Sequence, residues 1–270
     1  MSNKIILVTG AFGLIGLPLS VDLIKRGHKV VLGDIDNVKR PQVDSYLNNL
    51  DLPSDAYLTV ILDITSETSI QSALRQTIEK YGDLHVLINN AAIDAKFDPT
   101  GKAHLESASF ENYPIDVIKK SLEVNTLGTV LVTQLFCRYA LERGFGNIVN
   151  VASTYSLLAP NQELYDWGQA TESVIKKPVD YIVSKSFIPN FTRYIATYYG
   201  KKNIRCNAIA PHGVYNNHES GFLDNFSKLS PMGRMCDVEE LFGTFQFLIS
   251  DESKYMTGST LVIDGGWSAW

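Results

Sequence analysis

A tyrosine and a lysine stand four residues apart in Tyr181-Ile182-Val183-Ser184-Lys185, at the start of an amphipathic stretch. Residues at this spacing share one face of a helix. A phenol with its ordinary pKa of about 10 is a poor acid or base at neutral pH. A lysine ammonium about one helical turn away favours the phenolate. The pair therefore predicts a general acid–base residue; the alternative is an ordinary pair on a helix surface.

Glycines recur at every third position after the first apolar run, in Thr9-Gly10-Ala11-Phe12-Gly13-Leu14-Ile15-Gly16, and a helical stretch follows. Such glycines permit a tight turn, close approach of the backbone to a pyrophosphate, and close packing of helix on strand. The helix N-terminus then offers free N–H groups to the phosphates. A strand before and a helix after indicate a dinucleotide site rather than a structural turn. Its contacts are expected from Gly10, Phe12, Gly13, Ile15 and Gly16.

An aspartate, Asp34, ends the second apolar run. A carboxylate there can accept hydrogen bonds from both adenosine ribose hydroxyls and repels a 2′-phosphate. Asp36 is a second candidate, and the nearest cations are Lys39 and Arg40. We therefore expect NAD(H) in preference to NADP(H), the alternative being that Asp34 merely ends a strand. Asp63, at the end of the third run, is expected to hold the adenine amino group in the same way.

Short apolar runs alternate with longer amphipathic stretches, which predicts a doubly wound α/β sheet. Several runs are rich in Val, Ile and Leu without polar alternation, as in parallel strands covered on both faces. Strands are expected at residues 5–8, 30–33, 58–62, 86–88, 148–151, 204–209 and 260–263, and helices at 15–26, 69–81, 114–143, 180–199 and 238–250.

Three stretches fit the alternation poorly: residues 93–112, 157–179 and 211–231. Each follows an expected strand, so all three lie at the carboxyl edge of the sheet, where ligands bind in open α/β folds. Long loops in a compact domain are usually functional. We expect the substrate at this edge.

The chain resembles the short-chain dehydrogenase/reductase family over essentially its whole length. The resemblance implies one Rossmann-like domain over residues 1–270, with helices on both faces of a seven-stranded parallel sheet in the order 3-2-1-4-5-6-7. Besides the glycine loop and the Tyr181–Lys185 pair, it rests on Asp63-Ile64-Thr65, Asn89-Asn90-Ala91-Ala92, Asn125, Ser153, Ile209-Ala210-Pro211-His212-Gly213-Val214, and the run from Met256-Thr257-Gly258 to Val262-Ile263-Asp264-Gly265-Gly266.

The resemblance also implies the role of each catalytic residue. Tyr181 exchanges the proton, and Lys185 binds the nicotinamide ribose and tunes Tyr181. Ser153 hydrogen-bonds the reacting oxygen, and Asn125 supports a water that links Lys185 to solvent. Cofactor contacts are further expected from Tyr181, Lys185, Ile64, Asn90, Ala91, Ala92, Pro211, Gly213 and Val214.

Several features depart from the family's usual pattern. The glycine spacing looks like the extended branch, whereas length and tail look like the single-domain branch. His212 stands where glycine is usual, and the gap from Ser153 to Tyr181 is unusually long.

This long gap and residues 89–96 look like a subset placed in bacterial surface-sugar pathways, for flagellin modification and legionaminic-acid-type sugars. Aromatic rings beside polar groups suit a sugar; a lid or an oligomer contact is the alternative role for the long segment. Expected substrate contacts are Asp94, Lys96, Tyr155, Tyr165 and His212.

Composition narrows the class of partner. A net charge of -5 and the lack of any basic run argue against nucleic acid. Three scattered cysteines favour a reduced, cytoplasmic setting, and no apolar run is long enough to span a bilayer. Neither HExxH nor Cys-x-x-Cys is present, so no catalytic metal is expected.

We therefore expect an NAD(H)-dependent oxidoreductase that interconverts a secondary alcohol and a ketone, on a sugar, sugar phosphate or nucleotide sugar. A 3-oxoacyl or small-ketone reductase is the alternative within this class. A non-catalytic NAD-binding regulator is the alternative outside it, although such a protein has no need for all four of Asn125, Ser153, Tyr181 and Lys185. By resemblance, a homodimer or homotetramer is expected.

Overall fold

The computed structural model describes residues 3–94, 109–165 and 176–270. Within these ranges the strands form one seven-stranded parallel sheet in the order β3-β2-β1-β4-β5-β6-β7, as predicted. The strands are β1 (Ile5–Thr9), β2 (Lys29–Asp34), β3 (Tyr57–Ile61), β4 (Val86–Asn89), β5 (Gly146–Val151), β6 (Ile204–Pro211) and β7 (Thr260–Ile263). The helices are α1 (Gly16–Lys25), α2 (Arg40–Asn48), α3 (Glu67–Tyr81), α4 (Ile115–Ser121), α5 (Thr129–Arg143), α6 (Val179–Lys185), α7 (Ile188–Tyr199), α8 (Ser220–Leu229) and α9 (Phe242–Ile249).

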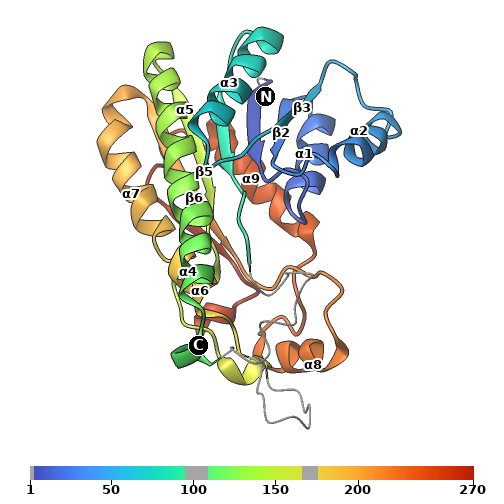
Figure 1. Cartoon of the computed structure of the whole chain (residues 1–270), viewed down its shortest axis with the longest axis vertical. Helices are drawn as coiled ribbons and strands as arrows, with labels where there is room; N and C mark the ends of the chain where they lie inside the picture. The colour runs from blue at the N-terminus through green and yellow to red at the C-terminus, as the bar shows by residue number, and fades with distance from the viewer. Residues whose placement is uncertain (1–2, 95–108, 166–175) are drawn as a thin grey trace.

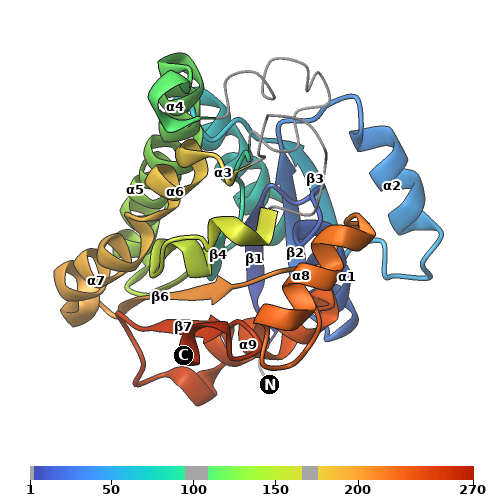
Figure 2. The same cartoon turned by 90° about the horizontal axis from the view of Figure 1, so that it is seen from below.

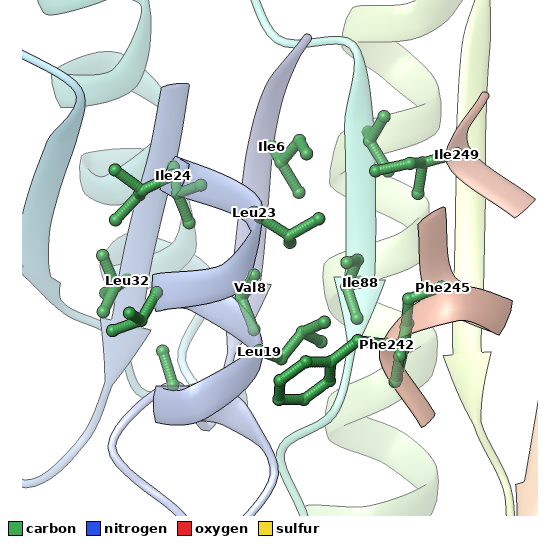
Figure 3. Packing of buried hydrophobic residues seen from close by; sticks show 14 of the residues in the cluster. Ile6, Val8, Leu19, Leu23, Ile24, Leu32, Ile88, Phe242, Phe245 and Ile249 are labelled. Atoms are coloured by element: carbon green, nitrogen blue, oxygen red, sulfur yellow. The ribbon is translucent and has the colours of Figure 1, made fainter. Parts of the chain in front are cut away.

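Both faces of the sheet are covered, which explains the unbroken apolar runs. Successive side chains of a strand point to opposite faces. In β1, Ile6 and Val8 pack into one hydrophobic cluster with α1 and α9, and Leu7 packs into the other with α3 and α5. Figure 3 shows the first cluster, where side chains of α1 and α9 meet those of the strands. Figure 2 shows α5 and α7 on one side of the strands and α1 and α9 on the other.

Two helices were not predicted. α2 buries only Val43 and Leu47, so its apolar face is too narrow to stand out as a periodic pattern. α8 lies inside the stretch read as irregular, and it buries Phe222 and Phe226 one turn apart. In Figure 1, α8 lies at the same end of the molecule as α4 and α6.

Two predicted helices are each divided. A π-helical segment, Leu122–Gly128, separates α4 from α5 and contains Asn125. The stretch expected at 180–199 breaks between Lys185 and Ile188, because Pro189 in the first turn of α7 has no N–H to continue α6. Of the described helices, none is long and apolar enough to cross a membrane.

Candidate active site

A cavity of about 910 Å³ opens at the carboxyl edge of the sheet, and the residues with chemical potential line it. Tyr181 and Lys185 reach it from α6, and Ser153 reaches it from the residues that follow β5. Ser153 is close enough to Tyr181 to act on the pKa of its phenol. The structure therefore brings together three of the four residues expected to be catalytic.

The electrostatics of Tyr181 differ from the simple expectation of a lowered pKa. Burial raises the pKa of Tyr181, the negative charge of Asp94 raises it further, and the hydrogen bond with Ser153 acts in the opposite direction. Burial lowers the pKa of Lys185 to about 8, against the effect of Asp94. The Lys185 Nζ donates to the carbonyl of Val151 at 2.8 Å, which holds its side chain against the end of β5.

Asn125, the fourth expected residue, is buried in the π-helical segment and does not line the cavity. Its Oδ1 accepts from the N–H of Ile93 at 2.8 Å, and its Nδ2 donates to the carbonyl of Ile93 and to Ser184 Oγ, both at 2.9 Å. Asn125 thus clamps the chain after β4 to the helix that carries Tyr181.

A second lysine, which the sequence analysis missed, lies at the same place. Lys177 Nζ pairs with Asp94 Oδ2 at 2.5 Å, and its ammonium lies 4.3 Å from the centroid of the Tyr181 ring. The side chains of Lys177 and Asp94 are only 5% and 15% exposed. Lys177 lies four residues before Tyr181, and this spacing is the signal in the sequence that could have identified it as a residue of the site.

The glycine loop has the shape that a dinucleotide needs. Gly10 has φ +62°, a backbone conformation that residues with a side chain rarely adopt. A Cβ on Gly16 would lie 2.3 Å from the Gly10 carbonyl oxygen and 2.7 Å from the Ala11 Cα. Glycine at both positions keeps the loop narrow and leaves the first turn of α1 open to a phosphate.

A groove of about 420 Å³ continues from this loop. Asp34, Asp63 and Ile64 line it at the ends of β2 and β3, together with Gly10, Gly13, Ile15, Asn90, Ala91 and Ala92. Pyridine nucleotides bind across such a groove in Rossmann-like folds. The loop and the groove therefore fit this cofactor.

The chain after β4 is tied to the glycine loop. Thr9 Oγ1 accepts from the N–H groups of Asn90 and Ala91, each at 3.0 Å. The Asn90 amide donates back to the carbonyls of Thr9 and Gly10. The floor of the groove is thus held rigidly.

Phe12 departs from its expected role. Its side chain is only 2% exposed and belongs to the hydrophobic core, and its N–H already donates to Asp34 Oδ2 at 2.8 Å. Phe12 therefore orients Asp34 and does not line the groove. Lys39, one of the two cations nearest to Asp34 in the sequence, donates from its Nζ to the Phe12 carbonyl oxygen.

The expected substrate residues Tyr155, Tyr165 and His212 line the large cavity. The hydroxyls of Tyr155 and Tyr165 lie 3.1 Å apart. His212 packs among Tyr155, Phe226 and Trp267, and its Nε2 is buried without a hydrogen-bond partner in the described structure.

Other expected contacts are also placed. Pro211, the last residue of β6, lines the cavity, as do Gly213 and Val214 just after that strand. Lys96 lies outside the described residues. Within the described ranges, His, Cys, Asp and Glu side chains do not gather in groups of three or more that could hold a metal ion.

Comparison with known proteins agrees with this geometry. A family model described as enoyl-(acyl carrier protein) reductase matches residues 10–268. The chain is 32% identical to post-translational flagellin modification protein A of Campylobacter coli over 267 residues, which cover 99% of both chains. It is 31% identical to 7alpha-hydroxysteroid dehydrogenase of Bacteroides fragilis over 271 residues, covering 98% of this chain and 94% of the relative.

A solved structure shares the fold as well. The short-chain dehydrogenase of Leptospira borgpetersenii with bound NAD⁺ superposes with a TM-score of 0.80 at 29% identity. The match covers 99% of this chain and 94% of that one.

Proposed function

The chain belongs to the short-chain dehydrogenase/reductase family of oxidoreductases that act on CH–OH groups, and we propose that it interconverts a secondary alcohol and a ketone with NAD(H). The observation that carries this proposal is that Tyr181, Ser153 and Lys185 line one cavity, with Ser153 close enough to Tyr181 to act on the pKa of its phenol. A phenol can transfer a proton to a carbonyl oxygen or take one from an alcohol, while a neighbouring hydroxyl hydrogen-bonds the reacting oxygen.

Each residue has a role in this reaction. The nicotinamide cofactor, when bound, supplies or accepts the hydride. In the oxidation direction, the Tyr181 phenolate takes the proton of the substrate hydroxyl while Ser153 hydrogen-bonds the reacting oxygen. In reduction, the Tyr181 phenol returns that proton. The positive charge of Lys185 favours the phenolate, and Asn125 holds Ile93 and α6 in register.

We propose NAD(H) over NADP(H) because Asp34 lines the groove at the end of β2. Lys39 lies against the same loop and works against this preference. We expect kcat/KM to be higher with NAD⁺ than with NADP⁺ by about tenfold or more, because like charges in a partly enclosed site repel by about 1.4 kcal/mol or more.

Matched variants separate the two charges. Asp34→Asn should lower the ratio of kcat/KM with NAD⁺ to kcat/KM with NADP⁺, and Lys39→Met should raise this ratio. A wild-type enzyme that prefers NADP⁺ would refute the assignment.

For the substrate we propose a sugar, a sugar phosphate or a nucleotide sugar. The cavity wall combines aromatic rings with the hydroxyls of Tyr155 and Tyr165 and with the Asp94–Lys177 pair. Rings stack on the C–H faces of sugars, and charged groups exchange hydrogen bonds with their hydroxyls. The similarity to a flagellin modification protein supports the same class.

A 3-oxoacyl or small-ketone reductase remains the second candidate. Phe222 and Phe226 of α8 supply an apolar stretch of the cavity wall, which would suit an apolar ketone. The relative named as a hydroxysteroid dehydrogenase is consistent with such a substrate.

The deciding experiment incubates the protein with NAD⁺ and amino sugars, sugar phosphates or nucleotide sugars and follows NADH absorbance, with Tyr181→Phe as the control. Turnover on a sugar that is lost in the variant supports both the chemistry and the substrate class. Tyr181-dependent turnover only with NADH and simple ketones or 3-oxoacyl compounds keeps the chemistry and rejects the sugar. No turnover with either the sugars or the simple ketones and 3-oxoacyl compounds favours a non-catalytic NAD-binding regulator.

We also propose a homodimer or homotetramer. Tyr194 and Tyr198 of α7 are 58% and 64% exposed, and Leu141 of α5 is 42% exposed. Large apolar side chains on neighbouring helices are typical of a contact surface. Light scattering of the protein should give at least twice the monomer mass of 30.0 kDa; a monomeric mass would refute this.

The three free cysteines support a cytoplasmic location.

A further inference from the structure

Lys177 and Asp94 form an ion pair that lies directly against the reacting phenol. Asp94 follows β4, and Lys177 closes the long segment between Ser153 and Tyr181. The N–H of Lys177 donates to Gln162 Oε1 at 2.9 Å, so the same segment fixes its backbone. The Lys177 ammonium then lies 2.5 Å from Asp94 Oδ2 and 4.3 Å from the Tyr181 ring centroid.

The charged and titratable groups around Tyr181 come from several elements. Lys185 lies on α6, the same helix as Tyr181. The Asp180 carboxylate of α6 accepts hydrogen bonds from the hydroxyls of Tyr113 and Ser121. The other groups that line the same cavity are Asp94 after β4, Asp116 and Lys120 on α4, Ser153 and Tyr155 after β5, Tyr165 and Lys177 in the long segment, and His212 and His218 after β6.

Among these groups, Asp94 opposes the phenolate. It is largely buried, so solvent screens its charge little. It disfavours deprotonation of Tyr181 and favours the charged form of Lys185. An ammonium held against Asp94 and over the Tyr181 ring offsets the first effect, because an opposite charge nearby favours the ionised phenol.

We propose that Lys177 is a positioning residue for proton transfer at Tyr181: its ammonium neutralises Asp94 beside the phenol and keeps the phenolate accessible for alcohol oxidation. The inference rests on the proposed oxidoreductase function. In the step concerned, the O–H and C–H bonds of the alcohol break and its C=O bond forms; the proton moves to the Tyr181 oxygen, and the nicotinamide, when bound, would accept the hydride of the C–H bond.

The inference predicts a shift in the pH dependence of alcohol oxidation. Lys177→Met removes this ammonium from Asp94, so deprotonation of Tyr181 becomes harder and the pH profile of oxidation moves to higher pH, with a loss of kcat/KM at neutral pH of up to about tenfold for each pKa unit. Asp94→Asn moves the pH profile of oxidation to lower pH, and the double variant returns toward wild type. Lys177→Arg retains the profile because it retains the charge.

The experiment measures kcat/KM against pH with glycerol or xylitol and NAD⁺, and with the matching ketones and NADH. Lys176→Met is the matched control, with the same change of charge one residue away. A second readout needs no substrate: the tyrosinate absorbance of each NAD⁺-loaded protein is titrated, and the signal of the same protein with Tyr181→Phe is subtracted. The Tyr181 signal should move to higher pH in Lys177→Met and to lower pH in Asp94→Asn.

The possible outcomes are distinct. A pH profile of oxidation that does not move in Lys177→Met, a double variant as poor as Lys177→Met, or a Tyr181 titration that moves in neither variant would overturn the role of Lys177. If the Tyr181 titration moves in opposite directions in Lys177→Met and Asp94→Asn, the role of Lys177 is supported. If the protein at the same time turns over no alcohol or ketone, the proposed function is rejected.

Discussion

His212→Phe should make the stability of the protein less sensitive to acid. The His212 ring is 6% exposed and lies among Tyr155, Phe226 and Trp267. Phenylalanine keeps these aromatic contacts and removes both the titrating group and the unpartnered Nε2. The substitution thus isolates the cost of protonating a buried imidazole.

The magnitude follows from the difference between folded and unfolded states. Burial lowers the pKa of His212 to about 4 in the folded protein, against about 6.5 in the unfolded chain. The unfolded state therefore binds the proton more readily, so the folded state loses stability as the pH falls from 6.5 toward 4. Above pH 6.5 the His212 ring is neutral in both states and costs no stability. From about pH 8 to about pH 5, this one group lowers the free energy of unfolding by about 2 kcal/mol.

Urea unfolding at these two pH values, followed by tryptophan fluorescence, measures the effect. Trp267 lies 4.3 Å from His212 between ring centroids and serves as a local reporter. His28 and His85 also have lowered pKa values, but both are present in wild type and variant and cancel in the comparison. Any strain from the larger ring acts equally at both pH values. An acid-induced loss of stability as large in His212→Phe as in wild type would refute the reasoning.

Two further substitutions test the scaffold of the site. Gly16→Ala puts a Cβ 2.3 Å from the Gly10 carbonyl oxygen; overpacking against backbone costs about 1–3 kcal/mol, so calorimetry should show a lower Tm and weaker NAD⁺ binding. Gly200→Ala is its control, since a Cβ there meets nothing within 4 Å, and an equal effect of the two would contradict the prediction. Asn125→Ala leaves the N–H and C=O of Ile93 without their buried partner, which costs about 1–3 kcal/mol in urea unfolding; an unchanged midpoint would show that the clamp contributes nothing.

Much of the fold follows from local patterns in the sequence. The buried runs of β1, β2 and β4 have no polar alternation because helices cover both faces of the sheet, and that pattern alone indicates parallel strands. The glycine loop is also readable, since the positive φ of Gly10 and the contact of Gly16 with the Gly10 carbonyl are local to the loop, although Gly10 also lies against Ala91. Helix α2 escaped prediction because two buried side chains make too weak a pattern.

By itself, the sequence determined the alternation of strands and helices and the glycine loop, and its resemblance to a family implied the strand order and the convergence of Tyr181, Ser153 and Lys185. Strand ends and helix starts are local, so the sheet brings such residues to one edge. Only the tertiary structure decided that Lys177 pairs with Asp94 across 83 residues of chain, that Phe12 is a core residue, and that His212 lies in an aromatic enclosure. These contacts depend on how irregular segments pack against distant elements, and no periodic pattern encodes that packing.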